Sequence, residues 1–178
     1  MPRLILLNGP PGAGKSTLAR RYAEEHPLTL NLDIDRVRAM LGRWREDLPA
    51  AGILARDIAL AAARTHLTSG NDVVVPQFLG RVAFIERLEA LAHDVGATFH
   101  EIVLLDTREN LLRRLTERSL TSANVEANDT LDGGLAEVSA AYDRLMSVIG
   151  QRPGARIVRV EEGDVDRTYR AMWNAVAT

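Results

Sequence analysis

Short apolar runs alternate along this chain with longer segments in which apolar residues recur at helical spacing. The first run, residues 3–8, contains four consecutive aliphatic residues and ends at a glycine-rich loop, which predicts a strand buried on both faces. Similar apolar or β-branched runs predict strands at residues 28–32, 72–75, 98–105 and 156–160. The periodic segments predict helices at residues 15–25, 35–41, 50–69, 81–95, 108–120, 131–149 and 165–176.

The order of these elements indicates the fold class. Strands that alternate with helices favour a parallel sheet covered on both faces, so we expect a three-layer α/β domain with a parallel five-stranded sheet. A chain of 178 residues is long enough for one sizeable core. No linker, internal repeat or low-complexity tail divides it, so residues 1–178 are predicted to form a single domain.

Composition narrows the classes of function. The formal charge is −2, so a general electrostatic affinity for nucleic acid or an anionic membrane is not expected, although a local basic patch is compatible with it. The chain has no cysteine, which excludes disulfides, thiolate zinc sites and cysteine nucleophiles. The four histidines show no metal-ligand spacing. No segment approaches the roughly 18–20 apolar residues of a membrane span, so we expect a cytoplasmic protein.

One motif points to a specific chemistry. Residues 9–17 follow the G-x-x-x-x-G-K-[ST] pattern of a phosphate-binding loop, between a predicted strand and a predicted helix as the motif requires. Lys15 is the only lysine in the sequence, and its compact ammonium is expected to reach the β- and γ-phosphates of ATP or GTP. Ser16 is expected to ligate Mg²⁺, and Thr17 to contact an outer phosphate. The predicted nucleotide-binding residues are Gly9, Pro10, Pro11, Gly12, Ala13, Gly14, Lys15, Ser16 and Thr17.

A pair of aspartates follows the second predicted strand. Asp33 and Asp35 fall on the same side of an extended chain at the carboxyl end of that strand, where open parallel sheets bind ligands. Beside a metal–triphosphate, one carboxylate can hold a Mg²⁺-bound water and the other can accept the proton of an attacking hydroxyl. Arg38 shares a helix face with Asp35 and is expected to orient it or to hold the acceptor. The alternative is that Asp35 only caps the helix and Asp33 is solvated.

Together with the phosphate loop, residues 31–38 resemble a known family. They are similar to the acceptor-site segment of small P-loop kinases in the AAA_33-type group of ATPases, above all the polynucleotide 5′-hydroxyl kinase domain. This resemblance implies that Asp35 is the general base and that Arg38 holds the substrate. The pair is also similar to that of shikimate and gluconate kinases, which implies that Asp33 serves the metal. Chloramphenicol phosphotransferase and zeta-toxin kinases share the outline. The implied fold is of the nucleoside-monophosphate-kinase type with a helical lid.

The third predicted strand departs from the pattern of these relatives. It runs into Pro76, Gln77 and Phe78, where many relatives carry an acidic residue, so Asp33 is predicted to be the main protein group that serves the metal. Gln77 and Phe78 are predicted to lie beside the acceptor, where they would hydrogen-bond to it and stack on it. The alternative is a plain turn at the end of the strand.

Two weaker signals complete the candidate site. Trp44 lies in a loop between two arginines and is a candidate to stack on an acceptor ring, with a packing role as the alternative. Residues 161–168 resemble the loop that lies over the nucleotide base in small P-loop kinases. That resemblance implies contacts from Gly163 and Val165, and a simple strand–helix turn is the alternative.

Basic residues precede a polar segment in the second half of the chain. Arg114 and Arg118 are four positions apart and share a helix face. Residues 119–130, which follow them, have the composition of a closing lid. Kinases commonly bring positive charge to the transferring phosphoryl group on such lids, so both arginines are predicted to be catalytic, and Arg118 also to bind the nucleotide. The alternative is a solvated basic face paired with acidic neighbours.

These signals predict a Mg²⁺-dependent kinase that transfers the γ-phosphoryl group of ATP, or of GTP, to a hydroxyl. The near-neutral charge favours a small-molecule acceptor such as a nucleoside, a sugar or an antibiotic-like compound. A first alternative is a polynucleotide 5′-hydroxyl kinase, for which nucleic acid would be the partner. A second is a nucleotide-hydrolysing switch or regulatory module that signals by lid closure. The sequence identifies neither the acceptor nor the oligomeric state.

Overall fold

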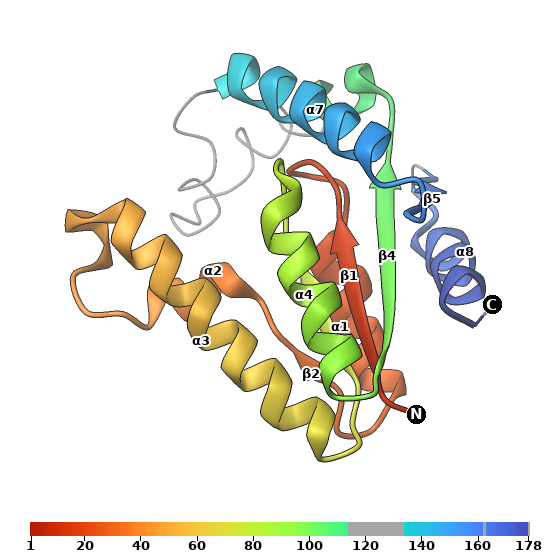
Figure 1. Cartoon of the computed structure of the whole chain (residues 1–178). Coiled ribbons are helices and arrows are strands. Elements are labelled where there is room, and N and C mark those ends of the chain that lie inside the picture. The colour runs from red at the N-terminus through yellow and green to blue at the C-terminus, as the bar shows by residue number, and fades with distance from the viewer. Residues whose placement is uncertain (114–133, 162, 178) are drawn as a thin grey trace.

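A computed structural model of the chain describes residues 1–113, 134–161 and 163–177, and helices cover both faces of a central sheet (Figure 1). Within the described residues this sheet has five strands, all parallel, as the sequence predicts. The strands are β1 (Arg3–Asn8), β2 (Leu30–Asn31), β3 (Val73–Pro76), β4 (Thr98–Leu105) and β5 (Arg156–Arg159).

The strand order is β2-β3-β1-β4-β5, so the first strand of the chain lies at the centre of the sheet. β1 pairs with β3 on one side, where Leu4 faces Val73, and with β4 on the other. Parallel strands bring all their carboxyl ends to one edge of the sheet. The segments that follow β1, β2 and β3 therefore meet at this edge, and they contain the phosphate loop, the aspartate pair and Gln77.

The helices lie close to their predicted positions. They are α1 (Lys15–Glu25), α2 (Ile34–Ala39), α3 (Leu48–Thr68), α4 (Val82–Asp94), α7 (Gly134–Gln151) and α8 (Val165–Ala177). Of the helix predicted at residues 108–120, the described residues 108–113 are helical. β2 is shorter than predicted because Leu28 has a positive φ of 62° and belongs to a turn. A 3-10 turn at Trp44–Glu46 was not predicted. Among the described helices, none has the length and apolarity needed to cross a membrane.

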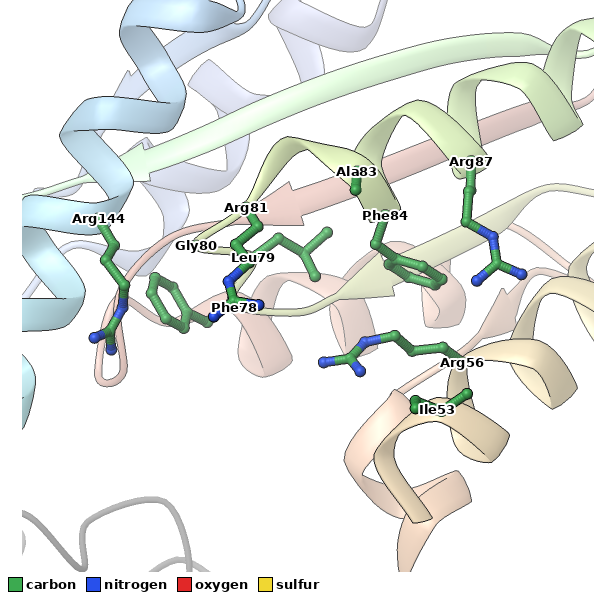
Figure 2. A pocket seen from close by; sticks show the side chains of 10 residues that line it. All are labelled: Ile53, Arg56, Phe78, Leu79, Gly80, Arg81, Ala83, Phe84, Arg87 and Arg144. Carbon is green, nitrogen blue, oxygen red and sulfur yellow. The ribbon is translucent and has the colours of Figure 1, made fainter. Parts of the chain in front are cut away.

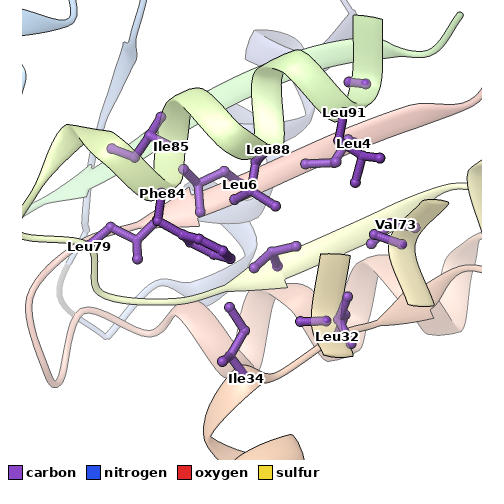
Figure 3. Packing of buried hydrophobic residues seen from close by; sticks show 14 of the residues in the cluster. Leu4, Leu6, Leu32, Ile34, Val73, Leu79, Phe84, Ile85, Leu88 and Leu91 are labelled. Carbon is purple, nitrogen blue, oxygen red and sulfur yellow. The ribbon is translucent and has the colours of Figure 1, made fainter. Parts of the chain in front are cut away.

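The side chains of β1 alternate between two apolar cores, one on each face of the sheet. Leu4 and Leu6 pack with residues of α3 and α4 (Figure 3). Ile5 and Leu7 pack on the opposite face with residues of α1 and α8. All four leucine and isoleucine side chains are fully buried. A strand that is apolar at every position is what a sheet buried on both faces requires, so the continuous aliphatic run of β1 explains the three layers.

A buried ion pair holds the end of α7 against the sheet. Arg152, which follows α7, donates to Glu101 of β4 across 2.8 Å and also pairs with Glu89 of α4 at 2.8 Å. Only 3% of the Glu101 side chain is exposed. Burial raises the pKa of Glu101, and the Arg152 guanidinium opposes that rise. The pair therefore fixes the carboxyl-terminal end of the helix that carries Arg144 into the site described below.

Replacing Arg152 with alanine is expected to destabilise the fold strongly. The substitution leaves the Glu101 carboxylate buried without its cation, which typically costs about 3–5 kcal/mol. Urea unfolding should report this as a loss in the free energy of unfolding. Arg64→Ala is the control because Arg64 and Asp94 form an exposed pair at 3.1 Å, worth about 1 kcal/mol or less. Equal losses in the two variants would contradict the role given to the buried pair.

Candidate active site

The phosphate loop has a backbone that depends on its glycines. Gly9, Gly12 and Gly14 all have positive φ, at 153°, 83° and 88°, a region that other residues enter at a cost. A Cβ on Gly9 would lie 2.7 Å from the carbonyl oxygen of Leu104, so glycine is also required there for space. Lys15 begins α1, and its ammonium donates to the carbonyl oxygens of Gly9 at 2.7 Å and Pro10 at 2.9 Å. The loop therefore curls tightly around its lysine, as a phosphate-binding loop must.

A buried asparagine that the sequence analysis missed joins the phosphate loop to the loop after β3. The Asn8 side chain is fully buried at the end of β1. Its Oδ1 accepts from the backbone N–H of Gly9 at 2.8 Å and of Leu79 at 2.9 Å. Its Nδ2 donates to the carbonyl oxygen of Leu79 at 3.2 Å. One side chain thus sets the distance between the two loops, and a polar residue at the end of an apolar strand was the available signal.

Asn8→Ala is expected to lower the free energy of unfolding by about 2 kcal/mol because it leaves buried backbone groups of Gly9 and Leu79 unsatisfied. Denaturant titration measures this loss. Asn71→Ala provides the matched control, since the Asn71 side chain donates to Ser69 at the surface and its replacement should cost less than about 0.5 kcal/mol. A stability for Asn8→Ala within error of the wild type would exclude the bridging role.

A small cavity of about 180 Å³ lies between the phosphate loop and the loop after β5. Gly12, Ala13 and Gly14 line it on one side, and Gly163 and Val165 on the other. The structure therefore brings together two segments that the sequence analysis had assigned to the nucleotide. Glu161 and Thr168, which belong to the predicted base-contacting loop at residues 161–168, also line it, and the lining residues that the sequence analysis did not name are Leu18 and Val160.

Thr168 makes hydrogen bonds to two described residues of the segment after β5. The Thr168 hydroxyl accepts from the N–H of Glu161 at 3.0 Å and donates to the carbonyl oxygen of Asp164 at 3.1 Å. Gly163 has a φ of 73°, which favours glycine. Thr168 therefore links Glu161 and Asp164, two residues of the segment that faces the phosphate loop.

The two aspartates have different partners. Asp33 is the N-cap of α2, and its Oδ1 accepts from the N–H of Asp35 at 3.0 Å and of Arg36 at 3.4 Å. Asp35 lies in the first turn, where Arg38 contacts Oδ1 at 3.2 Å and Gln77 donates to Oδ2 at 3.3 Å. The alternative in which Asp35 caps the helix and Asp33 is solvated therefore differs from the structure, because Asp33 is the cap. Asp35, Arg38 and Gln77 form one cluster, as expected from the sequence.

Gln77 connects this cluster to the central strand. Its backbone N–H donates to the carbonyl oxygen of Leu7 at 3.1 Å. Leu7 belongs to β1, the strand that leads directly into the phosphate loop. β3 lies between β2 and β1 in the sheet, and neighbouring strands are about 4.8 Å apart. The carboxylate of Asp35 thus lies on the same sheet edge as the phosphate loop, and Gln77 directly follows the strand between them.

Three buried polar atoms in the segment at residues 31–38 and in Gln77 have no hydrogen-bond partner within the described residues. They are Oδ1 of Asn31, Nε of Arg38 and Oε1 of Gln77. Buried polar groups are nearly always satisfied by protein, water or ligand. Their concentration in the segments around Asp35 therefore favours a polar ligand that both donates and accepts hydrogen bonds.

Phe78 and Trp44 have different surroundings. Phe78 lines a cavity of about 490 Å³ between α3, α4 and α7. Trp44 is not among the residues that line this cavity, and its ring lies between two guanidiniums, with Arg38 at 4.8 Å and Arg45 at 4.3 Å from the centroid. Its contacts thus favour the packing alternative, in which the indole holds Arg38 against Asp35. Arg114, Arg118 and the predicted lid at residues 119–130 lie outside the described residues.

The oxygen groups of the site fit Mg²⁺. Ser16 is exposed in the first turn of α1, and Asp33 lies at the carboxyl end of β2. Among the described residues, no group of three or more histidine, aspartate and glutamate side chains is arranged to hold a metal. Mg²⁺ in kinases is typically held by one or two protein oxygens together with phosphates and water. A hydroxyl and a carboxylate therefore form an adequate protein contribution.

Known proteins share this sequence and this fold. An adenylate kinase from Synechococcus sp. (strain WH7803) is 31% identical over 147 residues, which make up 78% of this chain and 79% of that protein. A gluconokinase from Sinorhizobium meliloti 1021 superposes with a TM-score of 0.67 at 18% identity, over 99% of this chain and 92% of that one. The tunicamycin resistance protein of Deinococcus radiodurans superposes with a TM-score of 0.58 at 17% identity, over 99% and 94%.

The parallel sheet, the phosphate loop after its central strand and the named relatives define the chain as a P-loop kinase. Residues 4–140 match the family model AAA_33, an AAA domain, and the chain belongs to that family. The resemblance based on residues 31–38 is thus confirmed at the level of the family and of the fold. The roles of individual residues stay predictions.

Proposed function

We propose that this kinase transfers the γ-phosphoryl group of ATP to a hydroxyl of a small molecule, with Asp35 as the general base. The observation that carries the proposal is the position of the Asp35 carboxylate. Arg38 and Gln77 hold it at 3.2 and 3.3 Å, and Gln77 is itself bonded to the strand that precedes the phosphate loop. A carboxylate fixed beside a phosphate loop is suited to accept a proton from an acceptor hydroxyl.

The proposed step is an in-line displacement. The acceptor oxygen forms a bond to the γ-phosphorus while the bond from this phosphorus to the β,γ-bridging oxygen breaks, and ADP leaves with the bond's electrons. The hydroxyl proton passes to Oδ1 or Oδ2 of Asp35. Lys15 and the loop amides stabilise the charge on the phosphate oxygens. When bound, Mg²⁺ neutralises phosphate charge, and Ser16 and Asp33 are the residues that would hold it.

The cavity between Gly12–Gly14 and the loop after β5 supports binding of the donor base next to the phosphate loop. Its walls are mainly backbone and small side chains. The predictions for Gly163 and Val165 are consistent with this geometry. ATP is the donor we expect, and a direct comparison of ATP with GTP as donors tests that choice.

A second candidate acceptor is a nucleoside monophosphate. The adenylate kinase relative at 31% identity favours it. A phosphate acceptor is already ionised, so it needs no general base. The Asp35 cluster and the unsatisfied polar atoms beside it support a hydroxyl acceptor instead, and we rank the hydroxyl first. A polynucleotide 5′-hydroxyl would use the same base, but its binding should weaken steeply as salt rises because phosphate contacts release counterions.

The test is a search for phosphorylated products. The protein is incubated with Mg·ATP and a pool of nucleosides, sugars, sugar acids, nucleoside monophosphates, aminoglycoside-like compounds and a 5′-hydroxyl oligonucleotide. Mass spectrometry then detects a gain of one phosphoryl group, and fragmentation locates it. A hydroxyl product supports the proposal, and a nucleoside diphosphate supports the second candidate. ATP hydrolysis without any phosphorylated compound would favour a nucleotide-hydrolysing switch.

A further inference from the structure

The cavity beside Phe78 is lined by four arginines from three helices and one loop (Figure 2). Its volume is about 490 Å³, and one of its lining residues is Phe78, which follows Gln77 in the sequence. α3 lies on one side, the loop after β3 and the start of α4 on the other, and α7 at the end. The arginines, all with side chains on the cavity wall, are Arg56, Arg81, Arg87 and Arg144.

These positive charges are only partly balanced. None of the described residues that line the cavity is acidic. Arg87 pairs with Asp57 at 2.7 Å, and Arg56 donates to the carbonyl oxygen of Gly52 at 3.2 Å. Within the described part of the chain, Arg81 and Arg144 form no ion pair. Guanidiniums gathered in one concave site repel one another and create a local positive potential, in a chain whose net charge is −2.

Aromatic rings accompany the arginines. The ring of Phe84 has the guanidinium carbons of Arg56 at 5.9 Å and Arg87 at 5.8 Å from its centroid. The ring of Phe78 has Arg144 at 5.9 Å. These rings give the cavity an apolar wall beside its cationic groups, so a suitable ligand has a carbon skeleton as well as negative charge.

The end of the cavity is closely packed. A Cβ on Gly80 would lie 3.2 Å from Cζ of Phe78 and 3.3 Å from Cβ of Arg144. Phe78 and Arg144 therefore pack directly against the glycine backbone. The Asn8 side chain makes hydrogen bonds to the backbone of Leu79 in the same loop. These bonds fix the arginine-bearing wall of the cavity relative to the phosphate loop.

We infer that the acceptor of the proposed reaction is an anionic compound whose carboxylate or phosphate monoester binds in this arginine-lined cavity, apart from the hydroxyl that reacts. The inference rests on the proposed function. Asp35 does not line the cavity, whereas Phe78 directly follows the glutamine bonded to Asp35. The hydroxyl at Asp35 and the anion at the arginines are thus adjacent parts of one ligand. The planar guanidinium of an arginine can donate two parallel hydrogen bonds to a carboxylate or a phosphate.

The test compares acceptors that differ only in charge. Sugar acids are paired with their parent sugars, nucleoside 5′-monophosphates with nucleosides, and aromatic hydroxy acids with their amides, each with Mg·ATP. We expect the charged member of at least one pair to have a kcat/KM at least tenfold higher, with the new phosphoryl group on a hydroxyl. The pair that responds distinguishes a carboxylate from a phosphate. Equal or greater efficiency with the neutral members would overturn the inference.

Variants of Arg81 and Arg144 identify the site. Arg81→Gln combined with Arg144→Gln should raise KM for the charged acceptor at least tenfold with little change in kcat, as expected for lost ground-state binding. Efficiency with the neutral partner should change less than twofold. Arg64→Gln is the control, because Arg64 lies nearer the carboxyl-terminal end of α3, pairs with Asp94 and does not line the cavity; this variant should behave as the wild type. An unchanged KM in the double variant overturns the assignment, whereas no transfer to any compound by the wild type overturns the proposed function itself.

Discussion

Lys15→Ala is expected to reduce phosphoryl transfer by about 10²–10³-fold, the range for removing one group that stabilises the charge of a transition state. Lys15→Arg should restore little because a planar guanidinium differs in shape and hydration from the ammonium. The ammonium lies within 2.9 Å of two carbonyl oxygens inside the curl of the phosphate loop, and a planar guanidinium would not reproduce this compact contact. Initial rates of ADP release, measured with saturating acceptor, give the comparison.

The composition of the chain provides an independent check on the same residue. Lys15 is the only lysine, so an amine-directed reagent such as acetic anhydride has only this side chain and the α-amino group as amine targets. Mg·ATP should slow acetylation of Lys15 while leaving the α-amino group unaffected, as quantified by peptide mass spectrometry. Equal labelling of Lys15 with and without nucleotide would contradict its predicted contact with the phosphates.

The elements with strong local signals were predicted well from the sequence. β1, α1 and β4 lie at their predicted bounds because each combines a clear apolar pattern with a clear end signal. β2 was predicted too long, since the two residues of actual strand, Leu30 and Asn31, depend on pairing with β3. The length of a short strand depends on such tertiary contacts, and the hydrophobic periodicity of the sequence contains no information about them.

The site was predicted in part, for the same reason. Asp35, Arg38 and Gln77 lie together in the structure, and motif spacing and sheet topology made their proximity predictable because parallel strand ends meet at one edge; their roles stay predictions. The arginine-lined cavity was missed because Arg56 and Arg144 are 88 positions apart and look like solvated helix residues in the sequence. Asn8 was missed as well, since its three hydrogen bonds go to backbone groups that the sequence does not reveal. Residues that act through long-range contacts leave weak local patterns.

Asp35→Asn is expected to lower kcat by about 10²–10⁴-fold, the usual contribution of a general base. Asparagine has nearly the same shape and can still accept the hydrogen bond from Gln77, so the fold and nucleotide binding should persist. Isothermal titration with ATP and urea unfolding verify both. Asp47→Asn, which alters the exposed N-cap of α3, is the matched control for the loss of one carboxylate and should keep the wild-type rate.

The same experiment separates the two aspartates and the two acceptor classes. Asp33→Asn keeps a good helix cap and should mainly raise the Mg²⁺ concentration needed for half-maximal rate, because its predicted role is to serve the metal. A loss of less than tenfold in Asp35→Asn would argue against proton removal as its role. That outcome would favour an acceptor that is already ionised, such as a nucleoside monophosphate, and the carboxylate would then serve to hold Arg38 at 3.2 Å.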